Sequence, residues 1–223
     1  MSNSLVFLQT TQGSSIKQLI ECLSPLLTDI NLIFQPKTSK SKGGITIKEI
    51  NKQSSVLVHC SLEADKFETF NYNSKEEKIV VGINLGYLLK CLKCMNNFDT
   101  MTWEINNNNT NELVIRFELK TNQKSEKKIF RLNLMDLEYN NMNINPINFS
   151  YLVSMPSTDF QKYCKDMAGA TDKLELLCNK NKLIFKGKGD LGSLEFQTHE
   201  SSSGLSIQIT DEDCKLFQGF FEL

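Results

Sequence analysis

The sequence lacks an apolar run long enough to cross a membrane, and its amino terminus lacks the basic start and long apolar centre of a signal peptide. It also lacks a large net charge, because 25 Lys and Arg against 26 Asp and Glu leave a formal charge of −1. The total charge therefore gives no general attraction to nucleic acid or membranes. The missing membrane span and signal peptide favour an intracellular protein. Any electrostatic function must then depend on charges of one sign gathered on one face of the folded protein.

Motifs for catalysis and cofactor binding are lacking too. The only histidines are His59 and His199, and neither lies in a recognisable pattern with a nucleophile. His59 alternates within a predicted strand, which favours a structural role. The sequence contains no P-loop or dinucleotide fingerprint. A nuclease, the main enzymatic alternative, would need clustered carboxylates to bind metal, and the acids here are dispersed. We therefore expect no enzyme and no cofactor.

The cysteines fit neither a disulfide framework nor a metal site. Seven of them, an odd number, are scattered from Cys22 to Cys214, as expected of reduced core residues. Cys91 and Cys94 have the spacing of a metal or redox pair, but the sequence has no second pair, and one helical turn directs both partly toward the core. We expect no metal.

What the chain does have is a pattern of short strands and helices that occurs twice. Its 223 residues, 40% of them apolar, can form two modest domains. The first part predicts helices at 14–27 and 84–95 and strands at 5–8, 30–35, 45–50, 56–62, 67–72, 78–82, 100–105, 112–119 and 127–134. The second predicts a helix opening at Pro156 and strands at 151–155, 173–178, 182–186, 194–198, 205–209 and 214–223. The repetition indicates a duplicated α+β unit, with domains at 1–133 and 150–223 and a connector at 134–149.

Each predicted helix has an apolar stripe and lysines that lie off it. The stripes are Ile16, Leu19, Ile20 and Leu23, then Leu85, Leu88, Leu89 and Leu92, then Phe160, Cys164 and Met167. The lysines off these stripes are Lys17, Lys90, Lys93, Lys162 and Lys165. Lys90 and Lys93 are three residues apart, as are Lys162 and Lys165. Lysine pairs at this helical spacing most often form a solvated face, but here the pair occurs in both copies.

The connector is rich in Asn and reads as an extended surface segment. It nevertheless carries Met142, Ile144 and Phe149, large apolar side chains that a solvated linker does not need. We expect these to line either the body beneath or a groove that a partner peptide enters.

Four segments carry a family resemblance. They are Gly82-Ile-Asn-Leu85 with Leu89-Lys-Cys-Leu-Lys-Cys94, Leu134-Met-Asp-Leu-Glu138, Met155-Pro-Ser-Thr-Asp-Phe160 with Cys164-Lys-Asp166, and Gly189-Asp-Leu-Gly192. In order and spacing, over roughly residues 14–223, they resemble the DNA sliding clamps of the proliferating cell nuclear antigen (PCNA) family. The resemblance implies an α+β DNA clamp fold with two similar domains, each with helices on one face of antiparallel sheet, that assemble into a ring. It also implies a processivity factor, not an enzyme, that encircles duplex DNA during replication and repair.

The resemblance further implies functional residues. Lys17, Lys90, Lys93, Lys162 and Lys165 would face the DNA, where lysines make sequence-independent phosphate contacts. Ile50, Leu57, Met142, Ile144 and Phe149 would line the pocket for client peptides. The strands 125–133 and 191–198 would join neighbouring subunits through Lys127, Ile129, Leu194, Glu195 and Phe196, and Lys180 would be a ubiquitin-attachment site.

The implied partners are double-stranded DNA bound without sequence preference, DNA polymerase and other clamp-binding proteins with short peptide motifs, a clamp-loader ATPase, and two further copies in a homotrimer. The implied location is the nucleus, or a viral replication site if a virus encodes the chain. An alternative is a checkpoint-type clamp subunit of a mixed ring, because Ser54 and Ser55 replace the family's larger pocket residues.

Other departures from the family concern length and register. Thr38–Gly44 is an insertion, Pro146 falls one place late, and the strand at Gly192 is short. The second copy reaches only Phe220–Leu223, before the family's fourth helix, so we expect domain 150–223 to be incomplete and the chain to be truncated.

Overall fold

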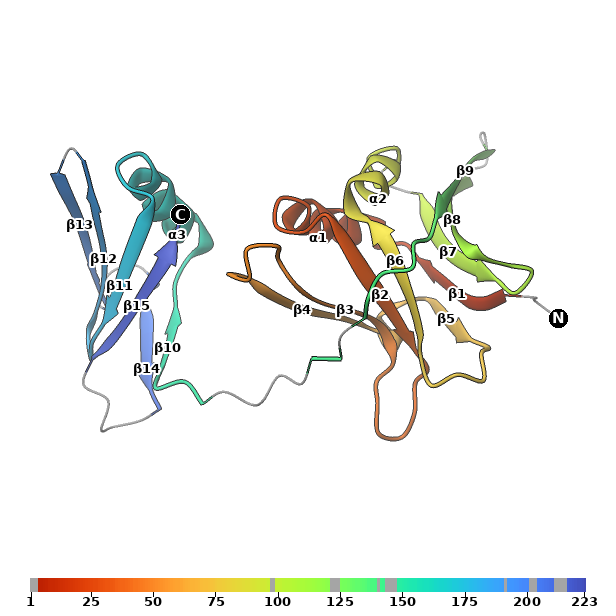
Figure 1. Ribbon diagram of the computed structural model, residues 1–223, viewed down its shortest axis with the longest axis horizontal. Helices are drawn as coiled ribbons and strands as arrows, with labels where there is room; N and C mark the ends of the chain where they lie inside the picture. The colour runs from red at the N-terminus through yellow and green to blue at the C-terminus, as the bar shows by residue number, and fades with distance from the viewer. Residues whose placement is uncertain are drawn as a thin grey trace. The chain divides into compact units, whose positions relative to one another are not determined.

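The computed structural model describes residues 4–96, 99–120, 125–139, 141–142, 148–190, 192–200, 204–210 and 216–223. It consists of two compact units, Met1–Asn143 and Ile144–Leu223 (Figure 1). The division between them falls inside the predicted connector, while the predicted domain boundaries themselves stay a prediction. No helix among the described residues is long and apolar enough to span a bilayer.

The first unit contains two antiparallel sheets and two helices. Its elements are β1 (Ser4–Thr10), α1 (Gly13–Leu23), β2 (Asp29–Gln35), β3 (Gly44–Ile50), β4 (Leu57–Glu63), the 3-10 turn Ala64–Lys66, β5 (Thr69–Tyr72), β6 (Ile79–Asn84), α2 (Leu85–Leu92), β7 (Thr100–Asn106), β8 (Asn109–Lys120) and β9 (Ser125–Asn133). The strand orders are β5-β1-β7-β8-β9 and β4-β3-β2-β6.

Local sequence pattern explains most of this core. Alternate residues of β1 are buried, as the two-residue period of a strand requires. Helices α1 and α2 pack against each other (Figure 1) and bury the predicted stripes, with Leu19 and Leu89 at the partly exposed margin. Strand β2 differs, since the five residues 30–34 are all buried. Both faces of β2 must therefore be covered.

The second unit repeats the topology of the first unit from β1 to β6. Its elements are β10 (Tyr151–Ser154), α3 (Ser157–Ala168), β11 (Lys173–Cys178), β12 (Lys182–Gly189), β13 (Gly192–His199), β14 (Ser206–Ile209) and β15 (Phe217–Glu222). The pair β10-β14 corresponds to β1-β5, and the order β13-β12-β11-β15 corresponds to β4-β3-β2-β6. The duplication expected from the sequence is thus present in the strand order.

The second unit is less completely covered than the first. In the first unit β7 pairs with the second edge of β1, and α2 packs beside α1. The described residues of the second unit include no counterpart of α2 or of β7, β8 and β9. Phe160, which occupies on α3 the position of Ile16 on α1, is consequently 43% exposed, whereas Ile16 is 7% exposed. Of the predicted α3 stripe only Met167 is fully buried.

Helix α1 ends at Leu23, the last residue of its apolar stripe, and does not reach the predicted residue 27. Pro25 has no N–H to donate to the carbonyl of Glu21. The hydroxyl of Ser24 donates to that carbonyl instead, at 3.3 Å. Helix α2 likewise ends at Leu92 and not at the predicted residue 95, because residues 93–94 form a turn.

A half-buried charge cluster joins strands of the first sheet. Glu104 on β7 forms an ion pair of 2.6 Å with Arg116 on β8 and accepts a hydrogen bond from the Ser4 hydroxyl on β1. Burial alone would raise the pKa of Glu104, but these hydrogen bonds and the attraction to Arg116 outweigh it and lower the pKa. Because the folded pKa is below the unfolded value, ionised Glu104 stabilises the fold at neutral pH, and this contribution is lost as pH falls through the folded pKa.

We predict that Glu104→Gln lowers the free energy of unfolding by about 1–2 kcal/mol at neutral pH, because charged hydrogen bonds are replaced by neutral ones. The difference from wild type should shrink as pH falls through the folded pKa. Urea denaturation across that range measures both effects. Glu77→Gln at an exposed site is the control, and a penalty for Glu104→Gln that is independent of pH would contradict the assignment.

Candidate functional site: the connector, the helix faces and the sheet edges

The first part of the connector crosses the outer face of the sheet β4-β3-β2-β6 (Figure 1). Met135 exchanges two backbone hydrogen bonds with Gly82 on β6, at 2.9 and 3.0 Å. The carbonyl of Glu138 accepts from the side-chain amide of Asn31 on β2, at 3.3 Å. The carbonyl of Met142 accepts from Nζ of Lys48 on β3. The connector is thus tied to three successive strands, which explains why Asn31 on the outer face is only 4% exposed.

Gly82 permits this crossing. A Cβ atom at this position would lie 2.5 Å from the carbonyl oxygen of Met135 and 2.6 Å from Cγ of Leu137. Only glycine avoids both contacts without moving the connector. A glycine inside a strand is a sign of close backbone approach, so this signal was present in the sequence.

Tyr139 provides a further tie. Nζ of Lys78 lies 4.3 Å from the centre of its ring and 3.2 Å from its hydroxyl oxygen. The hydroxyl in turn donates to Oδ1 of Asn141, at 3.2 Å. A cation over an aromatic face is stabilising, so this side chain holds the middle of the connector beside β6.

The hairpin turn between β3 and β4 is held by one side chain. Oδ1 of Asn51 accepts from the backbone N–H groups of Ser55 and Val56, both at 2.9 Å. Ser54 has φ of +57°, a left-handed conformation unusual for a residue with a side chain. The turn therefore has a defined shape although it is made of small polar residues.

The predicted client-pocket residues are only partly brought together. Ile50 and Leu57 are register partners beside this turn, and they are 45% and 47% exposed. Met142 reaches the same strand, β3, through its tie to Lys48. Phe149, 68% exposed, belongs to the second unit, and Ile144 lies outside the described residues. Sequence reasoning missed Asn31, Lys48 and Lys78, which position the connector.

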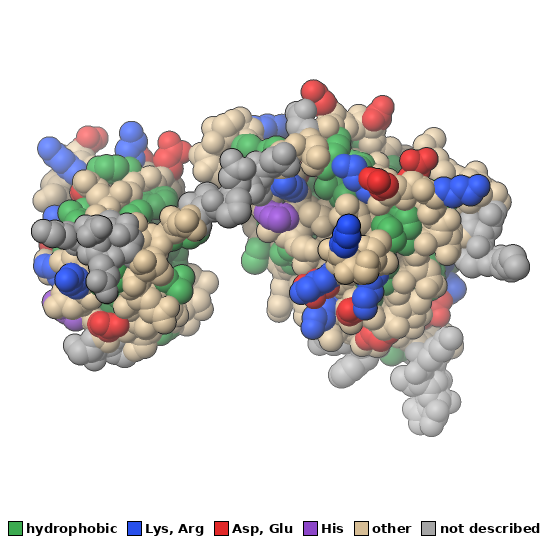
Figure 2. Space-filling model, turned by 90° about the horizontal axis from the view of Figure 1, so that it is seen from below, with side chains coloured by type: hydrophobic (Ala, Val, Ile, Leu, Met, Phe, Trp, Pro, Cys, Tyr) green, Lys and Arg blue, Asp and Glu red, His purple; other side chains and the backbone are tan. Residues whose placement is uncertain are grey.

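The predicted DNA-facing lysines lie on the helices and away from the cores. Lys90 and Lys93 are exposed on α2 and just after it, and Lys17 on α1 is half-buried. Lys162 and Lys165 are exposed on α3 of the second unit. Figure 2 shows the first unit from below the view of Figure 1. On that face Lys and Arg side chains are interspersed with Asp and Glu, so it is not uniformly positive.

One further cation lies near the α2 lysines and was missed from the sequence. Nζ of Lys128 on β9 donates to the backbone carbonyl of Cys94, at 2.9 Å. This carbonyl follows the end of α2, where the partial negative charge of a helix favours a cation. Nothing in the sequence near residue 128 indicates this contact, because it joins residues 34 apart.

The strands predicted to join subunits are edge strands. Strand β9 ends one sheet of the first unit, and β13 ends one sheet of the second. On β9, Ile129 is 43% exposed and Lys127 pairs with Glu118 of the same chain at 2.6 Å. On β13, the exposed Glu195 lies 3.3 Å from Lys186 of the same chain.

Two predicted interface side chains point inward instead. Leu194 and Phe196 pack against the core of the second unit, and the ring of Phe196 stacks on Tyr163 at 5.7 Å between centroids. The two-residue period of β13 directs both toward α3 and leaves Glu195 outside. Their contribution to a subunit contact would therefore come from the backbone. Lys180 is exposed in the turn between β11 and β12.

The two cysteines of the predicted pair differ in exposure. Cys91 is buried, and this burial raises the pKa of its thiol, which disfavours the nucleophilic thiolate. Cys94 is exposed, and its thiol donates to the carbonyl of Lys90. Within the described ranges, His, Cys, Asp and Glu form no group of three that could hold a metal ion.

Comparison with protein families agrees with this architecture. Residues 6–141 match the model of the N-terminal domain of proliferating cell nuclear antigen, and residues 143–211 match that of its C-terminal domain. The two matches meet inside the connector that crosses β6, β2 and β3. They cover most of the chain, including the second copy from β10 to β14. The chain therefore belongs to the proliferating cell nuclear antigen family, the non-enzymatic sliding clamps that act as processivity factors of DNA polymerase in replication.

Proposed function

We propose that three copies of this chain form a closed ring around duplex DNA in the nucleus, with β9 of one subunit paired to β13 of the next. The observation that carries this proposal is that both strands are edge strands of their sheets. An edge strand presents unpaired N–H and C=O groups, and a contact between two different edges can repeat head to tail until a ring closes.

The proposed DNA-facing residues are Lys17, Lys90, Lys93, Lys162 and Lys165. They lie on helices α1 and α3 and on or just after α2, off the stripes that form the cores. Ammonium groups on flexible stems bind phosphates without reading bases, which suits a ring that slides.

The proposed client site is the surface that Ile50 and Leu57 form beside the connector residue Met142, together with Ile144 and Phe149. Its support is the exposure of Ile50 and Leu57 at the end of a well-held hairpin. Polymerase and other replication and repair proteins would bind here through short apolar motifs, and a clamp-loader ATPase would open the ring. Lys180, exposed in its turn, is the proposed ubiquitin-attachment site.

One observation favours a second candidate, a clamp subunit that closes only in a mixed ring. Ser54 and Ser55 give the β3–β4 turn a small polar surface next to the client site. A clamp subunit that binds other client proteins would differ in the residues beside the client site, as this turn does. The mass of the assembly separates the two candidates.

We predict that light scattering gives three times the 25.4 kDa mass of one chain. Ile129→Asp should weaken this assembly about tenfold or more, because it places a charge in a contact that excludes water. Leu26→Asp is the matched control, since Leu26 is also 43% exposed but lies outside every strand. Equal weakening by both variants would rule out β9 as the interface. A wild-type chain that remains monomeric and assembles only with a second clamp protein would identify a mixed ring.

We predict that DNA binding falls steeply with salt and that Lys90→Ala with Lys93→Ala lowers the slope of log affinity against log salt by about 1.8, because each neutralised phosphate contributes about 0.9 to the slope. The assay uses a duplex blocked at both ends so that a ring cannot slide off. Lys40→Ala with Lys52→Ala, at exposed sites in the turns of the β-sheet, removes the same charge and should leave the slope unchanged. An equal slope for the two double variants would exclude the helix lysines as the DNA-binding face.

We predict that Gly82→Ala lowers the free energy of unfolding by about 1–3 kcal/mol, as overpacking does, and speeds hydrogen exchange at the Met135 amide. Gly169→Ala at the end of α3 is the control, because its backbone is helical and its Cβ would meet only carbonyl oxygens at the ordinary contact distances of 3.5 and 3.9 Å. This control should be neutral or slightly stabilising. If Gly82→Ala left Met135 exchange unchanged, the connector would not depend on this close crossing.

A further inference from the structure

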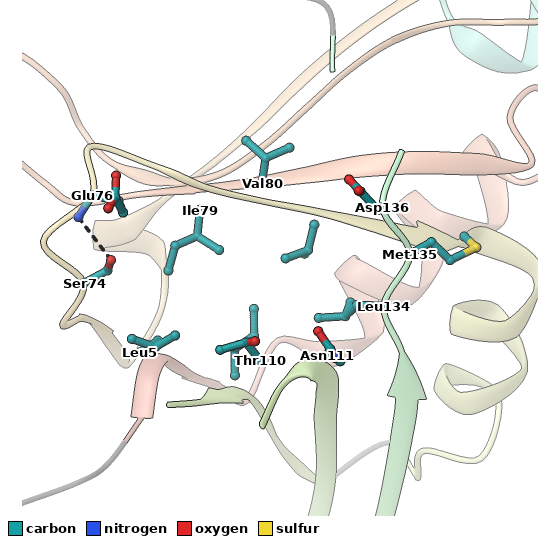
Figure 3. Close-up of a pocket in the computed structure, with 12 residues that line it drawn as sticks. Leu5, Ser74, Glu76, Ile79, Val80, Thr110, Asn111, Leu134, Met135 and Asp136 are labelled. Carbon is teal, nitrogen blue, oxygen red and sulfur yellow. Dashed lines mark hydrogen bonds between the residues drawn. The ribbon is translucent and has the colours of Figure 1, made fainter. Parts of the chain in front are cut away.

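A cavity of the first unit lies apart from the proposed client site, where the two sheets separate. It has a volume of about 470 Å³, within the range of ordinary ligand pockets. The lining is mixed. Polar residues contribute to it at Ser74, Thr110 and Asn111, and apolar side chains from β1, β6, β7 and the start of the connector form the rest of the wall: Leu5, Ile79, Val81, Ile105 and Leu134. Figure 3 shows Ile79 on one side of the opening, with Leu5 and Thr110 across from it.

The edge of β6 is open beside this cavity. On its other side β6 pairs with β2, through Ile33 with Val80 and Phe34 with Ile79. On the cavity side Met135 pairs with Gly82, after which the connector leaves the edge and crosses toward Asn31. Backbone groups of a strand alternate in direction, so the N–H and C=O of Val80 point to the same side as those of Gly82. In the part of the chain that the structure describes, no backbone hydrogen bond occupies them there.

The rim of the cavity is acidic. Glu76, before β6, and Asp136, in the connector, are both lining residues and both exposed, and the lining includes no Lys or Arg. Neither carboxylate forms an ion pair among the described residues. The nearby Lys78 is held over the ring of Tyr139. Figure 3 shows Glu76 and Asp136 at opposite ends of the same edge of the opening.

We propose that this cavity docks an extended peptide of a partner protein that carries one Leu, Ile or Val flanked by Lys or Arg. The apolar side chain fills the cavity between Ile79 and Leu134. The peptide backbone adds to β6 at Val80, as in other cases of strand addition to a sheet edge. The flanking cations meet Glu76 and Asp136. The site is distinct from the client surface at Ile50 and Leu57, and its occupant contacts the first residues of the connector.

The test uses a pool of six-residue peptides, each with a central Leu, Ile or Val between Lys or Arg residues, added to the full chain with labelled methyl groups. The NMR signals of Ile79, Val81, Ile105 and Leu134 should shift on titration, while those of Ile50 and Leu57 stay in place. The same pool with N-methylated backbone amides should bind more weakly, because these peptides lose the N–H groups that would donate to the backbone carbonyl of Val80. Absence of shifts at millimolar peptide, or shifts confined to Ile50 and Leu57, would overturn the proposal.

Charge reversal supplies the second arm. Glu76→Lys with Asp136→Lys should weaken binding of the basic pool about fivefold, the effect of losing two exposed ion pairs. Asp166→Lys with Asp172→Lys changes the net charge by the same amount at exposed sites of the second unit and should leave the affinity unchanged. An equal loss in both double variants, or equal binding of a pool flanked by Glu and Asp, would show that the acidic rim does not select the ligand.

Discussion

The fold of the first unit depends on covering both faces of the sheet β4-β3-β2-β6. Its inner face packs in the core beside α1 and α2, and its outer face is crossed by the connector. The burial of all five residues 30–34 of β2 follows from this double cover. So does the glycine at position 82, since a side chain there would occupy the volume of the connector. Backbone pairing of the connector with β6 is confined to Gly82, which leaves the next part of the β6 edge open beside the acidic cavity.

Features that depend on local periodicity could be predicted from the sequence. The stripe of Ile16, Ile20 and Leu23 is buried as expected, because residues three and four apart share one helix face. The strands lie within a few residues of their predicted ranges, and the strand order of the second unit repeats that of the first from β1 to β6. The same periodicity placed the lysines of α1, α2 and α3 off the cores.

Features that depend on contacts between distant residues could not be predicted. Asn31 meets Glu138 across 107 positions, and Lys48 meets Met142 across 94. No spacing rule relates residues so far apart. Leu194 and Phe196 show a second limit, because the family resemblance identified their strand but not the direction of its side chains. The limit that Pro25 sets on α1, in contrast, follows from the local sequence, since Pro25 removes the donor that the next helical turn needs.

The ties at Met135, Glu138 and Met142 all use main-chain atoms of the connector. The body of the first unit supplies the specific groups, namely the Gly82 backbone, the Asn31 amide and the Lys48 ammonium. Substitutions at these three connector positions, other than proline at 135, therefore keep every one of these bonds as long as the backbone path is retained. The proposed client surface could therefore change its chemistry through mutation while the path of the connector stays fixed, so that side-chain identity and backbone path are free to evolve separately in this part of the chain.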